Sequence, residues 1–398
     1  MGRLSQEAKS PDQVMANMSA LFDQLMFRRR IAMWTPVKST GADVCGFVSP
    51  VALALLVVVA TRRLGADEAP LLWKLLLEVL VDVAHVYGTL CRTVLDSEAT
   101  ALNWRLYLLA VPGLLLPTLF VNIVFGTWLG WSLLSYYAMF HFAKQPFGLL
   151  CIYKARQGER DPKEHQLDYW TCLAGAGLPL LQWHAGDFPD FAWFGGEDEK
   201  KLFQLPAVLL GPLRALHVLV PGVWLSFYLW RWLRGGRLNL GKLWIMVATY
   251  FTWYMGMCGH HVRSLAFINL FHGMSSSFLV YHVVRQRYSL WEAKNPQTMH
   301  WIDDHFNCVL VSTPVFYTCF LCGLACGEDL AWDILIHQDY MRPPVAPLEG
   351  LGRQVAVSCL MLPQLAHYFL DGFIWKMGPQ NPGLKDAVVT MAKDAKDR

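Results

Sequence analysis

The sequence predicts an all-α fold, a polytopic integral-membrane helical bundle with about ten transmembrane helices. Of its 398 residues, 54% are hydrophobic and only 16% are charged, whereas charged residues make up about 25% of an ordinary soluble chain. The apolar residues gather in stretches near 20 residues, the length that crosses a bilayer as a helix. Polar and charged residues gather between these stretches, as loops outside a bilayer require.

Ten apolar segments are expected to be the spans, although they differ in quality. The segment 71–94 carries Lys74, Glu78, Asp82 and His85 at helical spacing, which places one polar stripe on an otherwise apolar helix. The segments are 44–61, 71–94, 105–125, 128–153, 169–184, 204–232, 243–258, 264–284, 307–327 and 354–375. Pro212 and Pro221 predict a kink in 204–232. Three prolines, Pro343, Pro344 and Pro347, exclude a regular span from 328–353.

The chain divides into three parts. Residues 1–43 are predicted to form a cytoplasmic or interfacial segment, with an amphipathic stretch at 12–34. Residues 44–375 form the transmembrane domain, and the remainder, 376–398, is a polar tail. Lys and Arg concentrate in alternate loops, so the positive-inside rule predicts that both termini of this multi-pass protein are cytoplasmic.

Composition also narrows the partners. A net charge of only +3 gives no support for a nucleic-acid partner, so the expected partners are the lipid bilayer and an apolar small molecule. Most of the ten cysteines lie in or beside apolar segments, where cysteine behaves as a small hydrophobe. The spacing of Cys319, Cys322 and Cys326 resembles a metal motif, but a structural zinc site needs four ligands.

Histidines inside the apolar segments are the strongest functional signal. Five of them lie on five different predicted helices, and a polar group in hydrocarbon normally faces the bundle interior and marks function. Four of the five have a hydrogen-bond acceptor one helical turn away: Asp82 with His85, His141 with Gln145, Asn269 with His272, and His367 with Asp371. The fifth, His217, has only Arg214 as its neighbour, which favours a packing role.

These histidines predict a metal site. The expected topology places most of them within a slab about 10 Å thick, and a metal-binding histidine usually donates its second ring nitrogen to a carboxylate or carbonyl. We therefore predict His85, His141, His272 and His367 as ligands, with His261 as a fifth candidate. In the catalytic roles, Asp82 and Asp371 are expected to orient ligands or handle protons, and Gln145 and Asn269 to contact the ligands or the substrate.

Several neutral histidines with one or two carboxylates form a ligand set for iron, copper or zinc. The leading hypothesis is a non-haem iron or copper oxidoreductase, or oxygenase, that acts on a lipid-like substrate and draws on an electron donor. One alternative is a membrane electron carrier in which two histidines hold a haem. The other is a proton-coupled transporter, with a relay through Glu78, Asp82, His85 and Arg92.

Familiar motifs are absent from the sequence. It has no H-x-x-x-H or H-x-x-H-H pattern, which separates it from the familiar membrane desaturases and hydroxylases. It also lacks H-E-x-x-H, the phosphate-binding G-x-x-x-x-G-K-[ST] and the nucleophile elbow G-x-S-x-G.

Overall fold

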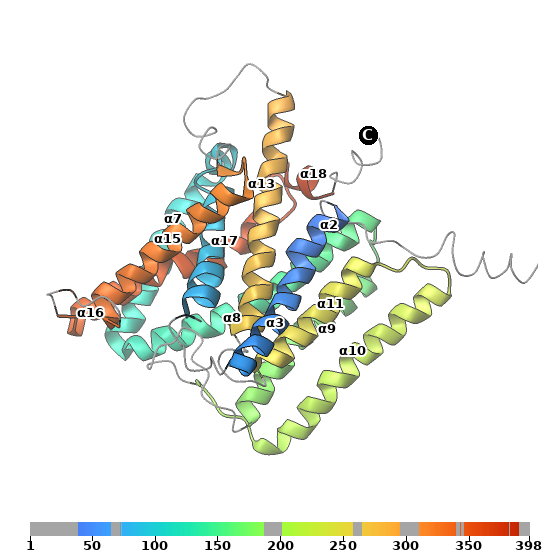
Figure 1. The fold of residues 1–398 in the computed structure, drawn as a ribbon, viewed down its shortest axis with the longest axis horizontal. Helices are drawn as coiled ribbons and strands as arrows, with labels where there is room; N and C mark the ends of the chain where they lie inside the picture. Colours follow the sequence, from blue (N-terminus) through green and yellow to red (C-terminus); the bar gives the residue numbers. More distant parts are fainter. Residues whose placement is uncertain are drawn as a thin grey trace, which may run out of the picture.

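The computed structural model describes residues 39–64, 72, 74–186, 201–257, 265–294, 310–339, 343, 346–381 and 383–389. Within this part of the chain the regular structure is entirely helical, with no strand, which confirms the all-α prediction. The long helices pack side by side in a bundle (Figure 1). The predicted stretch 12–34, His261 and the end of the tail lie outside the described residues.

The first half of the bundle runs from α2 to α9. Its elements are α2 (Thr40–Asp43), η1 (Val44–Val48), α3 (Ser49–Leu64), η3 (Lys74–Val83), α5 (Ala84–Val86), α6 (Gly88–Arg92), α7 (Ser97–Phe125), α8 (Thr127–Gln157) and α9 (Pro162–Ala185). The second half follows as η4 (Ala207–Leu209), α10 (Leu210–Leu233), α11 (Leu240–Met257), η5 (Leu265–Met274), α13 (Ser275–Lys294), α15 (Pro314–Trp332), η6 (Asp333–His337), α16 (Gly350–Leu360), α17 (Leu362–Ile374) and α18 (Leu384–Val389).

Three helical stretches of the described chain are long and apolar enough to cross a membrane: Thr40–Thr61, Ser97–Phe125 and Ala207–Leu233. In the last two, only 11% and 6% of the apolar window is buried inside the protein. Their apolar faces therefore point outward, as those of lipid-facing helices do. The other expected spans fold as helices, but the polar side chains that they carry lower their apolarity, and the count of ten stays a prediction.

Two expected spans are interrupted, which corrects their boundaries. The segment 71–94 divides into η3, α5 and α6, with a turn at Tyr87. The segment 354–375 breaks at Met361, and α17 starts with Pro363 in its first turn, where the missing N–H is tolerated. The helix expected at 307–327 is also displaced, because α15 continues to Trp332 and η6 follows it to His337.

Two π-helical segments that are far apart in the sequence lie against each other, η3 from the first half and η5 from the second. Their close approach depends on Gly273, because a Cβ built there would lie 2.7 Å from the Val81 carbonyl oxygen. Stretches of π-helix are uncommon and occur often at functional sites. Here η5 contains His272, and η3 ends two residues before His85.

Candidate metal centre

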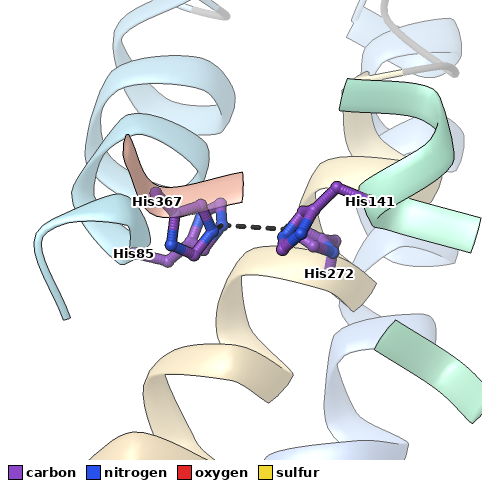
Figure 2. Close-up of side chains that lie close together, drawn as sticks. All are labelled: His85, His141, His272 and His367. Atoms are coloured by element: carbon purple, nitrogen blue, oxygen red, sulfur yellow. Dashed lines mark hydrogen bonds between the residues drawn. The ribbon is translucent and has the colours of Figure 1, made fainter. Parts of the chain in front are cut away.

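Four of the five predicted ligands meet in one place. His85 comes from α5, His141 from α8, His272 from η5 and His367 from α17, so four separate elements contribute one ring each (Figure 2). Each ring offers a nitrogen, and these four nitrogens all lie within 4.8 Å of one another. The residues are 1%, 8%, 3% and 2% exposed, respectively, so the cluster is closed off from solvent.

The spacing of the nitrogens fits a metal ion. His85 Nε2 lies 3.2 Å from His367 Nε2 and 3.0 Å from His272 Nε2. A tetrahedral ion with metal–nitrogen bonds of about 2.0–2.1 Å separates its ligand nitrogens by about 3.3 Å. The two contacts of His85 therefore lie within a few tenths of an ångström of this separation, and all four nitrogens lie within 4.8 Å of one another.

Hydrogen bonds satisfy this arrangement only in part. A neutral imidazole nitrogen carries either one N–H or one lone pair, so it makes one in-line hydrogen bond. His85 Nε2 nevertheless has two imidazole nitrogens at hydrogen-bond distance. One shared cation that accepts all the lone pairs removes this conflict, as metal coordination by neutral histidines does.

The ring planes are also arranged around a common point. The four neighbouring pairs have centroid separations of 4.5–5.1 Å and interplanar angles of 69–87°. Rings whose nitrogens bind one tetrahedral ion would have centroids separated by about 5 Å, from the same bond length. Figure 2 shows His85 with His367 on one side and His141 with His272 on the other.

Groups behind the rings hold two of them in orientation. Thr89 Oγ1 lies 2.6 Å from His367 Nδ1, and Asp371 Oδ1 lies 3.7 Å from the same nitrogen. If Nε2 of His367 binds a metal, Nδ1 carries the proton and donates to Thr89. Asp82 Oδ1 lies 3.5 Å from His85 Nδ1, so the predicted Asp82–His85 pair is adjacent, although longer than a hydrogen bond.

Asp371 is close to two of the histidines. Its Oδ2 lies 3.9 Å from His141 Nε2, in addition to the contact between Oδ1 and His367. The carboxylate therefore faces the cluster between rings from α8 and α17. A carboxylate in this place can balance the charge of a cation or take up a proton.

The two amides are placed differently from the prediction. Gln145 does not orient His141; its side-chain nitrogen donates to the backbone carbonyl of His272 at 3.2 Å. Asn269 is buried, but within the described chain neither its Nδ2 nor His272 Nδ1 has a hydrogen-bond partner. Gln145 therefore contacts the backbone of a candidate ligand, whereas the predicted Asn269–His272 hydrogen bond does not form at either of these nitrogens.

Aromatic rings surround the histidines. Phe142 stacks on His272 with centroids 3.5 Å apart, and Tyr368 lies against His141 at 4.8 Å. The Tyr368 hydroxyl donates to Gln364. Gln364 in turn lines a small hollow of about 50 Å³, which has room for water-sized molecules. Aromatic rings thus cover part of the cluster, and the small hollow lies beyond Tyr368 and Gln364.

Two further residues singled out in the sequence, His217 and Arg92, lie outside the four-histidine cluster. His217 lies against Tyr250 and Tyr254 and is not part of the four-histidine cluster. Arg92 is buried and donates to the Ile374 carbonyl, which ties α6 to the end of α17.

Sequence reasoning missed a second buried polar cluster, between α8, α9, α10 and α11. It contains three carboxylates and three cations: Glu159, Glu164 and Asp168 with Lys154, Arg231 and Lys242. Lys242 Nζ alone lies 3.2, 2.7 and 2.8 Å from the three carboxylates in turn. The positive charges balance the negative ones, so this cluster is an internal ion-pair network and not a cation site. The spacing of Glu164 and Asp168, one turn apart on a helix, was the available signal.

Comparisons with protein families, with characterised proteins and with solved structures found no match for this chain. The function must therefore be argued from the site itself.

Proposed function

We propose that this chain is a membrane metalloprotein whose four-histidine centre holds a single iron or copper ion and carries out oxidoreductase chemistry on an apolar substrate. The observation that carries the proposal is the convergence of four buried imidazole nitrogens from four elements within 4.8 Å. Imidazole ligands suit zinc, copper and iron. His85, His141, His272 and His367 would bind the ion, which would supply electron transfer.

The surroundings support redox chemistry in an apolar setting. The carboxylates of Asp82 and Asp371 would balance a divalent charge, and Asp371 is placed to hold or release a proton next to His141. Helix α17, which carries His367, packs on α7. The exposed apolar face of α7 would give apolar substrates a route to this side of the bundle.

The distances favour a bare ion over a haem. Two histidines that hold a haem lie on opposite faces of the porphyrin, with nitrogens about 4 Å apart. The contacts of 3.0 and 3.2 Å around His85 Nε2 are shorter. Four rings directed at one point also leave no open plane for a macrocycle.

The membrane setting is part of the proposal. Three helices have the length and composition of spans, and the proposed bundle adds the more polar helices around the centre to reach about ten. With this arrangement both termini are cytoplasmic.

A redox titration tests the function. Detergent-purified protein loaded anaerobically with Fe²⁺ or Cu⁺ is exposed to dioxygen with decylubiquinol, an apolar electron donor, while absorbance and electron paramagnetic resonance are recorded. We expect one ion per chain to change oxidation state and to return on reduction, and the H367A variant to lose this signal. An ion that does not respond to either reagent rejects the oxidoreductase proposal. A Soret band would favour the haem carrier, and pH-driven uptake into vesicles by the metal-free chain the transporter.

A further inference from the structure

A second cavity lies apart from the four-histidine cluster, between α10, α11 and the end of α9. Its volume is about 570 Å³, within the range of about 300–1,000 Å³ that is typical of small-ligand pockets. Helix α10 runs along the outer edge of the bundle beside α9 and α11 (Figure 1). Because so little of α10 is buried, the cavity opens on the side where lipid would lie.

One end of this groove is polar and rich in unused hydrogen-bond donors. Gln182 is only 3% exposed, yet its side-chain nitrogen has no partner within the described chain. His217 is half-buried, and its Nδ1 also has no hydrogen-bond partner within the described chain. Arg214 has no carboxylate within 4.0 Å among the described residues, although it is part of an apolar helix. A buried donor without an acceptor costs about 1–3 kcal/mol, so Gln182 and His217 favour an acceptor here, and the exposed guanidinium of Arg214 favours one that carries a negative charge.

The other end of the groove is apolar. It continues along α10 past Val218 and Pro221 to Leu225, and it is lined from α11 by Met246 and Val247. From Arg214 to Leu225 the helix rises about 16 Å, a length that suits a long acyl chain. The volume is that of one chain-like ligand rather than of a lipid with two chains and a large headgroup.

We propose that this groove binds a long-chain fatty acid from the bilayer, with its carboxylate between Arg214, His217 and Gln182 and its acyl chain along α10. A carboxylate accepts hydrogen bonds from all three side chains and pairs with the guanidinium. The apolar length then places the chain where lipid chains already lie. The groove is separate from the four-histidine centre, so this proposal does not depend on the metal.

Binding of tritiated palmitate to the full chain in nanodiscs of zwitterionic lipid tests the assignment. The wild type should bind palmitate saturably, and R214Q should weaken binding at least tenfold while R214K retains most of it. V247W, which fills the groove, should abolish binding. Two matched controls should bind as the wild type does: R105Q, an exposed arginine on α7, and V223W, on a part of α10 that does not line the groove.

Competitors identify the ligand chemistry. Unlabelled palmitate should displace the label, whereas methyl palmitate, which lacks the charge, should not. Monodisperse elution and unchanged melting temperatures show that the variants fold. The proposal is overturned if no saturable binding occurs, if R214Q binds as the wild type does, or if methyl palmitate competes equally. Displacement by equimolar phosphatidylglycerol would also overturn it, in favour of a phospholipid site.

Discussion

At the scale of single residues, the histidine centre is defined as much by the groups behind the rings as by the rings. Thr89 fixes His367 from its Nδ1 side, and Asp371 faces both His367 and His141. The supporting groups around a metal-binding histidine set its tautomer and orientation, and their removal typically lowers metal affinity about 10–100-fold.

Replacing Thr89 by valine tests this support. The change removes the hydroxyl at 2.6 Å from His367 Nδ1 and keeps a similar shape, so we expect metal affinity to fall about 10-fold or more. Competition with a chromophoric chelator measures the affinity. The matched control is T93V, because Thr93 is also buried on this stretch but its hydroxyl donates to the Thr89 carbonyl and not to a histidine. Equal affinities for T89V and T93V would contradict the assigned role.

The sequence predicted these four histidines as candidate ligands because a histidine in an apolar helix normally faces the interior of the bundle. It placed a carboxylate beside two of the rings but did not predict the contacts of Gln145 and Thr89. Spacing along one helix cannot show that Gln145 reaches the backbone of η5, or that Thr89 reaches a ring on α17, because both contacts join segments more than 100 residues apart.

At the scale of elements, the centre depends on the contact between η3 and η5. Gly273 permits that contact because any side chain there meets the Val81 backbone. The π-helical geometry of both segments was not predicted, since the sequence pattern of an apolar helix is the same for both helix types.

Replacing Gly273 by alanine should therefore separate η5 from η3. The added Cβ would lie 2.7 Å from the Val81 carbonyl oxygen, and we expect a loss of about 1–3 kcal/mol in stability together with weaker metal binding. Thermal unfolding and metal content measure the two effects. The control is G177A on α9, where a Cβ meets nothing within 4 Å and alanine favours a helix. If G273A and G177A behave alike, the close approach is not what positions His272.

The ion-pair network joins α8, α9, α10 and α11 through Lys242, which is fully buried. Loss of one member of a buried ion pair leaves an uncompensated charge and costs about 3–5 kcal/mol. We expect K242M to lower the unfolding midpoint strongly, and addition of E164Q to restore part of the loss. K163M, at an exposed position near the same loop, serves as control. A K242M chain as stable as K163M would show that the network contributes little.

At the scale of the whole molecule, the two helices α7 and α10 expose most of their apolar surface, while the histidines and the ion-pair network are buried. Composition and segment length were sufficient to predict the helical class. They could not fix the number of spans. The helices that carry the histidines and the ion pairs contain polar residues, which lower the apolarity by which a span is identified.

The proposed topology can be checked by glycosylation mapping in microsomes. Ten spans with a cytoplasmic N-terminus place the loop near residue 160 in the cytoplasm and the acidic run 197–199 on the opposite side. An acceptor site inserted after residue 198 should be glycosylated, and one inserted after residue 160 should not. Modification of both sites, or the reverse pattern, would contradict the arrangement.

The most direct test of the central claim is the metal content of the purified protein. Elemental analysis of the wild type after detergent extraction should give one iron or copper per chain. The H141A and H367A variants should lose most of it, while H217A, which alters a histidine outside the cluster, should retain it. A metal-free wild type after growth in metal-supplemented medium, or full occupancy in H141A and H367A, would contradict the account.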